Sequence, residues 1–180
     1  MSNLITSFIG FTGHRNLQDE VAVLSALRAT FAPWLAQPKA IRPLLLTGYA
    51  EGADRLAVQA WTEGGGLVHY LFPYADPNSE DHAWTDDPAT AGEECRIALD
   101  SLPGIKAVGS TKRDNDRITI PKPHATKSAH VCVAELLAKH ADHLVAAWDG
   151  VPRPGDGSKD GGTAHVVEIA GQKASIIEVT

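Results

Sequence analysis

Short apolar runs alternate along the chain with longer segments in which apolar residues recur every three or four positions. The apolar runs predict strands at 5–11, 44–47, 67–72, 105–108, 143–148 and 175–179. The helical spacing predicts helices at 17–36, 93–102, 125–141 and 163–170, and a short one around 56–61. This alternation is typical of an α/β fold with a doubly wound, mostly parallel, Rossmann-like sheet and helices on both faces.

The segments between these elements are polar and rich in glycine and proline. Loops are predicted at 73–92, 109–123 and 150–160, and Pro33 is expected to end or kink the first helix. In a doubly wound sheet, ligands bind beyond the carboxyl ends of the strands, where the strand order reverses. The loops after the first, second and penultimate strands are therefore the predicted site.

The first of these loops reads GFTGHR and ends at Arg15. A glycine after a strand allows a sharp turn toward a ligand, so Thr12 and Gly13 are candidate contacts. The planar guanidinium of Arg15 suits a phosphate, and His14 suits stacking on a base or donating to an oxygen. The alternative is a capped turn that exposes an arginine.

The second loop reads TGYAEGAD and leads into a helix. Gly48 and Gly52 flank amides that are suited to an anion at a helix N-terminus. Glu51 is a candidate acceptor for ribose hydroxyls. Asp54 is a candidate ligand contact, or it caps or lies in the first helical turn.

The third loop follows the penultimate strand. Asp149 is a second candidate acceptor for a ribose, and Gly161 and Gly162 precede a helix in a pattern typical of phosphate binding. Thr163 adds a hydroxyl donor, and Glu168 is the one candidate catalytic carboxylate. The alternative is a flexible loop followed by a surface glutamate.

Together the GFTGHR turn, the TGYAEGAD turn and the closing AAWDG…GGTAHVVEIA segment resemble the SLOG superfamily of Rossmann-like nucleotide-binding domains. The resemblance runs from residue 10 to residue 170. It implies a nucleotide-like ligand at these loops. SLOG domains of bacterial defence systems bind NAD-derived signals such as cyclic ADP-ribose variants, and relatives often form homo-oligomers.

The same superfamily includes the lonely-guy phosphoribohydrolases, which cleave nucleoside 5′-monophosphates at the N-glycosidic bond. Their motif PGGxGTxxE aligns with DGGTAHVVE, which retains Glu168 but places Asp160, Ala164 and His165 where the motif has Pro, Gly and Thr. Candidates for the partner arginine of that motif are Arg96, Arg113 and Arg117. We therefore predict binding or sensing of a nucleotide or an NAD/ADP-ribose-related ligand, with phosphoribohydrolase activity through Glu168 as the alternative. A third hypothesis is a structural homo-oligomer whose nucleotide site is vestigial.

Length and composition limit the possible domain organisation, partners and location of the protein. A chain of 180 residues with 43% hydrophobic residues predicts a single domain over 1–180. The net charge of -6 argues against a general nucleic-acid binder. Two cysteines give no disulfide framework, and no segment suits a membrane span, so a cytoplasmic protein is expected.

The eight histidines form no metal-binding pattern, so no metal site is predicted. No cofactor is predicted either. Trp84 is a candidate to close over a base.

Overall fold

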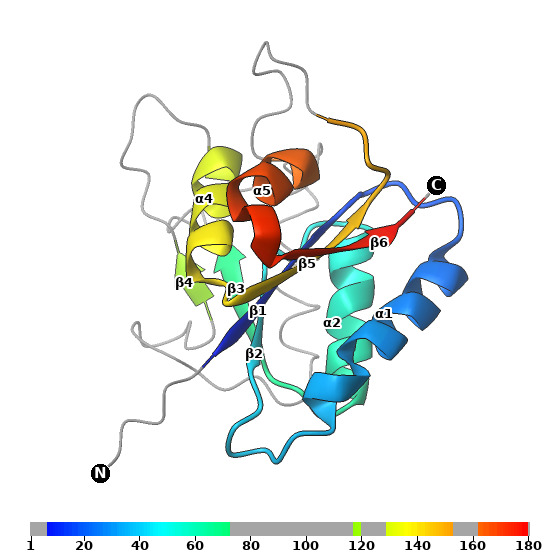
Figure 1. The fold of residues 1–180 in the computed structure, drawn as a ribbon, viewed down its shortest axis with the longest axis vertical. Coiled ribbons are helices and arrows are strands. Elements are labelled where there is room, and N and C mark those ends of the chain that lie inside the picture. Colours follow the sequence, from blue (N-terminus) through cyan, green and yellow to red (C-terminus); the bar gives the residue numbers. More distant parts are fainter. Residues whose placement is uncertain (1–6, 73–116, 120–128, 153–161, 180) are drawn as a thin grey trace, which may run out of the picture.

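The computed structural model describes residues 7–72, 117–119, 129–152 and 162–179. Its strands form one six-stranded sheet in the order β4-β3-β2-β1-β5-β6, in which every neighbouring pair is parallel (Figure 1). The strands are β1 (Phe8–Gly13), β2 (Leu44–Thr47), β3 (Val68–Phe72), β4 (Arg117–Thr119), β5 (His143–Trp148) and β6 (Ala174–Glu178). β1 lies at the centre, with β2 on one side and β5 on the other.

Helices cover both faces of this sheet. α1 (Glu20–Leu35) and α2 (Ala53–Glu63) pack on one face, and α4 (Ala129–His140) and α5 (Thr163–Ala170) on the other (Figure 1). A short 3-10 helix, Gly171–Lys173, joins α5 to β6. The predicted α/β fold class is therefore confirmed.

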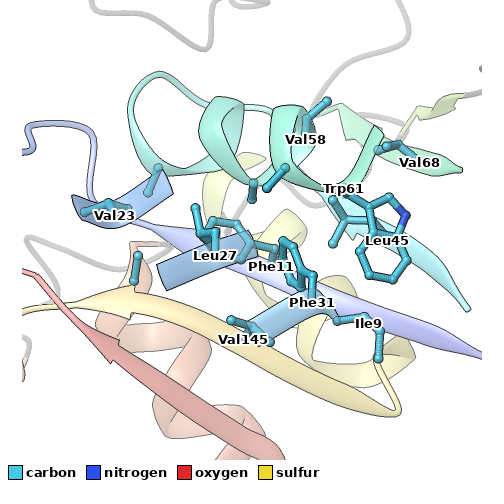
Figure 2. Close-up of a cluster of buried hydrophobic side chains, with 14 of the residues drawn as sticks. Ile9, Phe11, Val23, Leu27, Phe31, Leu45, Val58, Trp61, Val68 and Val145 are labelled. Carbon is cyan, nitrogen blue, oxygen red and sulfur yellow. The ribbon is translucent and has the colours of Figure 1, made fainter. Parts of the chain in front are cut away.

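The two faces of the sheet are buried in separate cores. Neighbouring residues of one strand point to opposite faces, so Leu45 packs with α1 and α2 whereas Leu46 packs with α4. Figure 2 shows the first core, in which Phe31 of α1 meets the indole ring of Trp61 of α2 edge-on at 5.1 Å. Both helices are thereby fixed against β1.

Most element boundaries agree with the hydrophobic pattern, and the differences have local causes. β1 extends through Thr12 and Gly13 because both pair with β5. α1 begins only at Glu20, because the side chain of Asp19 caps the helix by accepting from the Ala22 amide at 2.9 Å. The helix also continues through Pro33, contrary to one of the two expected outcomes.

β4 corrects the prediction of a polar loop at 109–123. Its three residues add to the edge of the sheet, where Ile118 pairs with Leu71. A strand of three residues shows no periodicity that a sequence pattern could reveal. The predicted helix at 93–102 and strand at 105–108 lie outside the described residues. Within the described ranges, no helix is both long and apolar enough to cross a membrane.

Candidate functional site

The strand order reverses between β1 and β5. From β1 the chain builds β2, β3 and β4 to one side, and then crosses to add β5 and β6 on the other. After β1 and β5, which are neighbours, the chain consequently leads from the carboxyl edge of the sheet to helices on opposite faces (Figure 1). This is the position at which open α/β sheets bind ligands.

The loops after β1 and β5 are in direct contact there. The His14 amide donates to the Ala147 carbonyl at 3.1 Å, and the His14 Nε2 atom lies 3.1 Å from Asp149 Oδ1. The Val151 amide donates to the same Asp149 oxygen at 2.9 Å. The Val151 amide and then His14 hold the pKa of Asp149 below its usual value. Oδ1 of Asp149, a predicted acceptor for ribose hydroxyls, is thus already engaged by its own loop and by His14.

The loops after β1 and β2 are equally close. The Ala53 amide donates to the His14 carbonyl at 3.0 Å, so this first amide of α2 is occupied rather than available to an anion. Gly52 has a φ of 78°, and a Cβ atom there would lie 2.1 Å from the Arg15 carbonyl oxygen. A Cβ atom on Gly13 would lie 2.4 Å from the Ala53 side chain. Only glycines permit this packing, which holds Arg15 beside the β2 loop.

Asp54 lies in the first turn of α2 and is buried. Its Oδ2 atom accepts from the Thr47 hydroxyl at 3.0 Å and from the Ala50 amide at 3.3 Å. Burial raises the pKa of Asp54 to about 7, although these hydrogen bonds, the Gly13 amide and the charge of Arg15 all lower it. The side chain therefore lies behind the β2 loop and supports it from within, rather than facing outward as a ligand contact.

Tyr49 in the β2 loop and Arg55 in the first turn of α2 are two neighbouring residues that sequence reasoning missed. Tyr49 adopts a φ of 59°, which is unusual for a non-glycine residue, and it is buried. The Arg55 guanidinium lies 5.6 Å from the centre of its ring and 3.8 Å from the Glu51 carboxylate. Glu51, the other predicted ribose acceptor, is therefore paired with Arg55. The position of Tyr49 between two glycines hints at a tight turn, but no sequence signal gives the sign of its φ.

The third predicted loop leads into α5, whose N-terminus lies at the same edge of the sheet. Because β5 and β6 are parallel, the helix between them must begin at the carboxyl edge. Gly162 precedes α5 with a φ of −80°, a conformation open to any residue, and Thr163 is buried. Gly161 lies outside the described residues, as do Trp84, Arg96 and Arg113.

Glu168 is an exposed residue at the sixth position of α5. At 100° per residue it points away from the side of the helix that Val166 and Ala170 bury. His165, which replaces the threonine of the phosphoribohydrolase motif, is buried. Arg117, the remaining candidate for the partner arginine, begins β4 at the far side of β3.

Some predicted residues meet and others do not. The residues at the meeting point of the β1, β2 and β5 loops are Gly13, His14, Arg15, Gly52 and Asp149. Thr12 lies within β1, and Gly48 is buried directly after β2. Among the described side chains, no three histidine, cysteine, aspartate or glutamate residues are grouped so as to hold a metal ion.

Comparisons with known proteins agree with the fold. No family model matches the sequence, and no curated protein matches it. The structure is similar to the X-ray structure of DNA processing protein A (DprA) from Streptococcus pneumoniae, with a TM-score of 0.52 and 12% sequence identity. The similarity covers 97% of this chain and 59% of that chain, so this chain spans little more than half of that protein. The likeness supports a Rossmann-like α/β fold.

Proposed function

We propose that the chain is a single nucleotide-binding domain that binds or senses a nucleotide or an NAD/ADP-ribose-related ligand at the carboxyl edge of its sheet. The observation that carries this proposal is the meeting of three loops where the strand order reverses. Gly52 packs on the Arg15 carbonyl, and His14 lies against Asp149 across that point. Such a crevice is the usual ligand position in this fold class.

The chemistry of the three loops favours an anionic ligand with hydroxyl groups. Arg15 offers a planar guanidinium for a phosphate, and the half-buried imidazole of His14 offers a donor or a stacking surface. The N-terminus of α5 adds amides that favour negative charge. The resemblance of the loop sequences to SLOG domains, together with the SLOG-like fold, supports a nucleotide as the anion.

Thermal unfolding with a ligand panel tests the proposal. AMP, NAD, ADP-ribose and cyclic ADP-ribose are each added to the protein, and a true ligand at 100 times its Kd should stabilise the fold by about 2.7 kcal/mol. Arg15→Gln should abolish the shift. Arg28→Gln is the matched control, because Arg28 lies on α1 and pairs with Glu63 on the surface. No stabilisation by any member of the panel would refute the proposal.

Two further arms separate the remaining hypotheses. Release of adenine from AMP by the wild-type protein but not by Glu168→Gln would establish the phosphoribohydrolase alternative in place of a sensor. A single-stranded oligonucleotide belongs in the panel because the structural neighbour is named as a DNA processing protein. The net charge of -6 predicts that the oligonucleotide gives no shift. Size-exclusion chromatography tests the expected homo-oligomer.

A further inference from the structure

Asp54 is a buried acid whose hydrogen bonds from Thr47 and Ala50 both reach the same carboxyl oxygen. It is only 5% exposed, and the hydrogen bonds from the Thr47 hydroxyl and the Ala50 amide both reach Oδ2. Oδ1 is buried as well and has no hydrogen-bond partner of normal geometry among the described residues. A proton can therefore reside on Oδ1 without breaking either bond to Oδ2.

The charge of Asp54 depends on the proposed ligand site. Arg15 attracts the carboxylate and thereby favours its ionised form, against the unfavourable burial of that charge. Arg15 is also the residue expected to hold a phosphate. A bound phosphate would offset the positive charge of Arg15 and add negative charge nearby. Both changes favour the protonated acid.

In the described part of the chain, the loops next to Asp54 carry two further pairs of charged or titratable groups. On the β1 and β5 loops, His14 lies against Asp149, and on the β2 loop and α2, Glu51 lies against Arg55. Arg15 on the β1 loop is the cation whose field reaches Asp54. A negative charge placed beside Arg15 would therefore also act on Asp54.

We propose that Asp54 takes up a proton when an anionic ligand binds at the β1 and β2 loops, so that binding at this site is linked to pH. This inference rests on the proposed function, and it makes Asp54 a positioning residue that also senses charge. Because burial raises the pKa of Asp54 to about 7, the linkage falls near neutral pH. Linkage is reciprocal, so a rise in pH must weaken ligand binding by the same coupling.

The test uses ADP-ribose, whose pyrophosphate keeps its full charge from pH 6 to pH 8. Titration calorimetry with the wild-type protein should give a Kd about tenfold higher at pH 8 than at pH 6. Repeating the titration at pH 7.5 in two buffers of different ionisation enthalpy should show net proton uptake. Asp54→Asn should remove both the change of log Kd with pH (the slope) and the proton uptake. The quantity that tests the proposal is this slope and not the affinity at one pH.

Two controls assign the proton to Asp54. His14→Asn should weaken binding yet keep the slope, because histidine is the other residue type here that changes charge near neutral pH. Carbon-13 NMR of the aspartate carboxyls in the wild-type protein should show Asp54 titrating at higher pH when ADP-ribose is bound. This measurement needs no variant, so it holds even if Asp54→Asn does not fold.

The outcomes distinguish the two proposals. Binding of ADP-ribose with no proton uptake, or an unchanged slope in Asp54→Asn, would overturn the role of Asp54 and leave the ligand site standing. Absence of binding by ADP-ribose and by the rest of the panel would overturn both. A slope that disappears in His14→Asn instead would assign the linkage to His14 and reject Asp54.

Discussion

Gly52 has a φ of 78°, and its α-carbon faces the carbonyl oxygen of Arg15. An alanine here would meet two separate penalties, the strained backbone and a contact of 2.1 Å with a backbone atom. The strain alone costs about 1–3 kcal/mol, because a φ of 78° with a ψ of -126° is a region that residues with a Cβ rarely adopt. The contact adds to it because the preceding residue, His14, is held by the Ala147 carbonyl and by the Ala53 amide, so the backbone at Arg15 has little room to move away.

Gly52→Ala should therefore lower the free energy of unfolding by roughly 3 kcal/mol or more. Gly150→Ala is the matched control, since Gly150 has the same φ of 78° but no atom within 4 Å of a Cβ. The free energy of unfolding of Gly150→Ala should fall only by the amount that the backbone strain costs. Urea denaturation of both variants measures the difference, and equal losses would mean that the close packing of the two loops is not what Gly52 provides.

His69 is a buried histidine in β3 whose Nε2 atom has no hydrogen-bond partner among the described residues. Burial lowers the pKa of His69 from its usual 6.5. Below that pH the unfolded chain binds a proton that the folded protein resists, so stability falls as the pH falls. The free energy of unfolding should drop by up to ~2 kcal/mol from this group between pH 7.5 and pH 5.

His69→Leu should be less sensitive to acid than the wild type. The measurement is chemical denaturation across this pH range, and the quantity of interest is the difference in slope between the two proteins, because carboxylates contribute equally to both. Parallel slopes would show that His69 does not titrate with unfolding.

Arg42 connects the C-terminal ends of two helices. Its guanidinium donates to the carbonyls of Leu35 and Gln37 at the end of α1, and to those of Gly64 and Gly65 after α2. These are carbonyls that a helix end leaves without partners, and a cation is favoured there by the helix dipole. One side chain thus caps the C-terminal ends of both helices that cover this face of the sheet.

Arg42→Met should destabilise the protein by about 2–3 kcal/mol, because it removes four hydrogen bonds, of which those to the Leu35 and Gln37 carbonyls are partly buried. Arg28→Met is the control on the same helix pair. Arg28 lies 2.8 Å from Glu63, but both side chains are about half exposed, so its loss should cost under ~1 kcal/mol. Thermal unfolding distinguishes them, and comparable losses would contradict the role given to Arg42.

Elements with a strong pattern were predicted well, and elements without one were not. β2, β5 and α5 have the predicted boundaries, because each combines an apolar run or a helical stripe with glycine or proline at its ends. β4 was missed, since three residues carry no period. The start of α1 was misplaced because the capping role of Asp19 outweighed the apolar Leu17 before it.

The reversal of strand order places His14 and Asp149 in contact although they are far apart in sequence. The pair is partly exposed, at 33% and 41%, so either substitution to asparagine should change stability by less than ~1 kcal/mol. Binding of ADP-ribose should nonetheless weaken by about tenfold in His14→Asn, a loss of about 1.4 kcal/mol.

The double variant should bind no worse than the poorer single variant, because the two residues act as a pair. Titration calorimetry of the wild type, the two single variants and the double variant provides the double-mutant cycle. Wild-type affinity in all three variants would place the ligand away from the β1–β5 crossing.

The amino-acid order alone was enough to indicate the α/β class and the three loops that lie at the ends of β1, β2 and β5. Both follow from local signals, because periodicity defines each element and parallel strands place their carboxyl ends at one edge. The residue roles within those loops did not follow in the same way. Glu51 and Asp149 were expected to face a ribose, yet each lies against a cationic or imidazole group of the protein.

Those pairings depend on side chains from different segments, and on backbone angles such as that of Tyr49, which no nearby residue specifies. The same is true of Asp54, whose burial comes from the packing of α2 against β1 rather than from its neighbours in sequence. Local chemistry therefore located the loops, whereas long-range packing decided which of their polar groups hold the loops together.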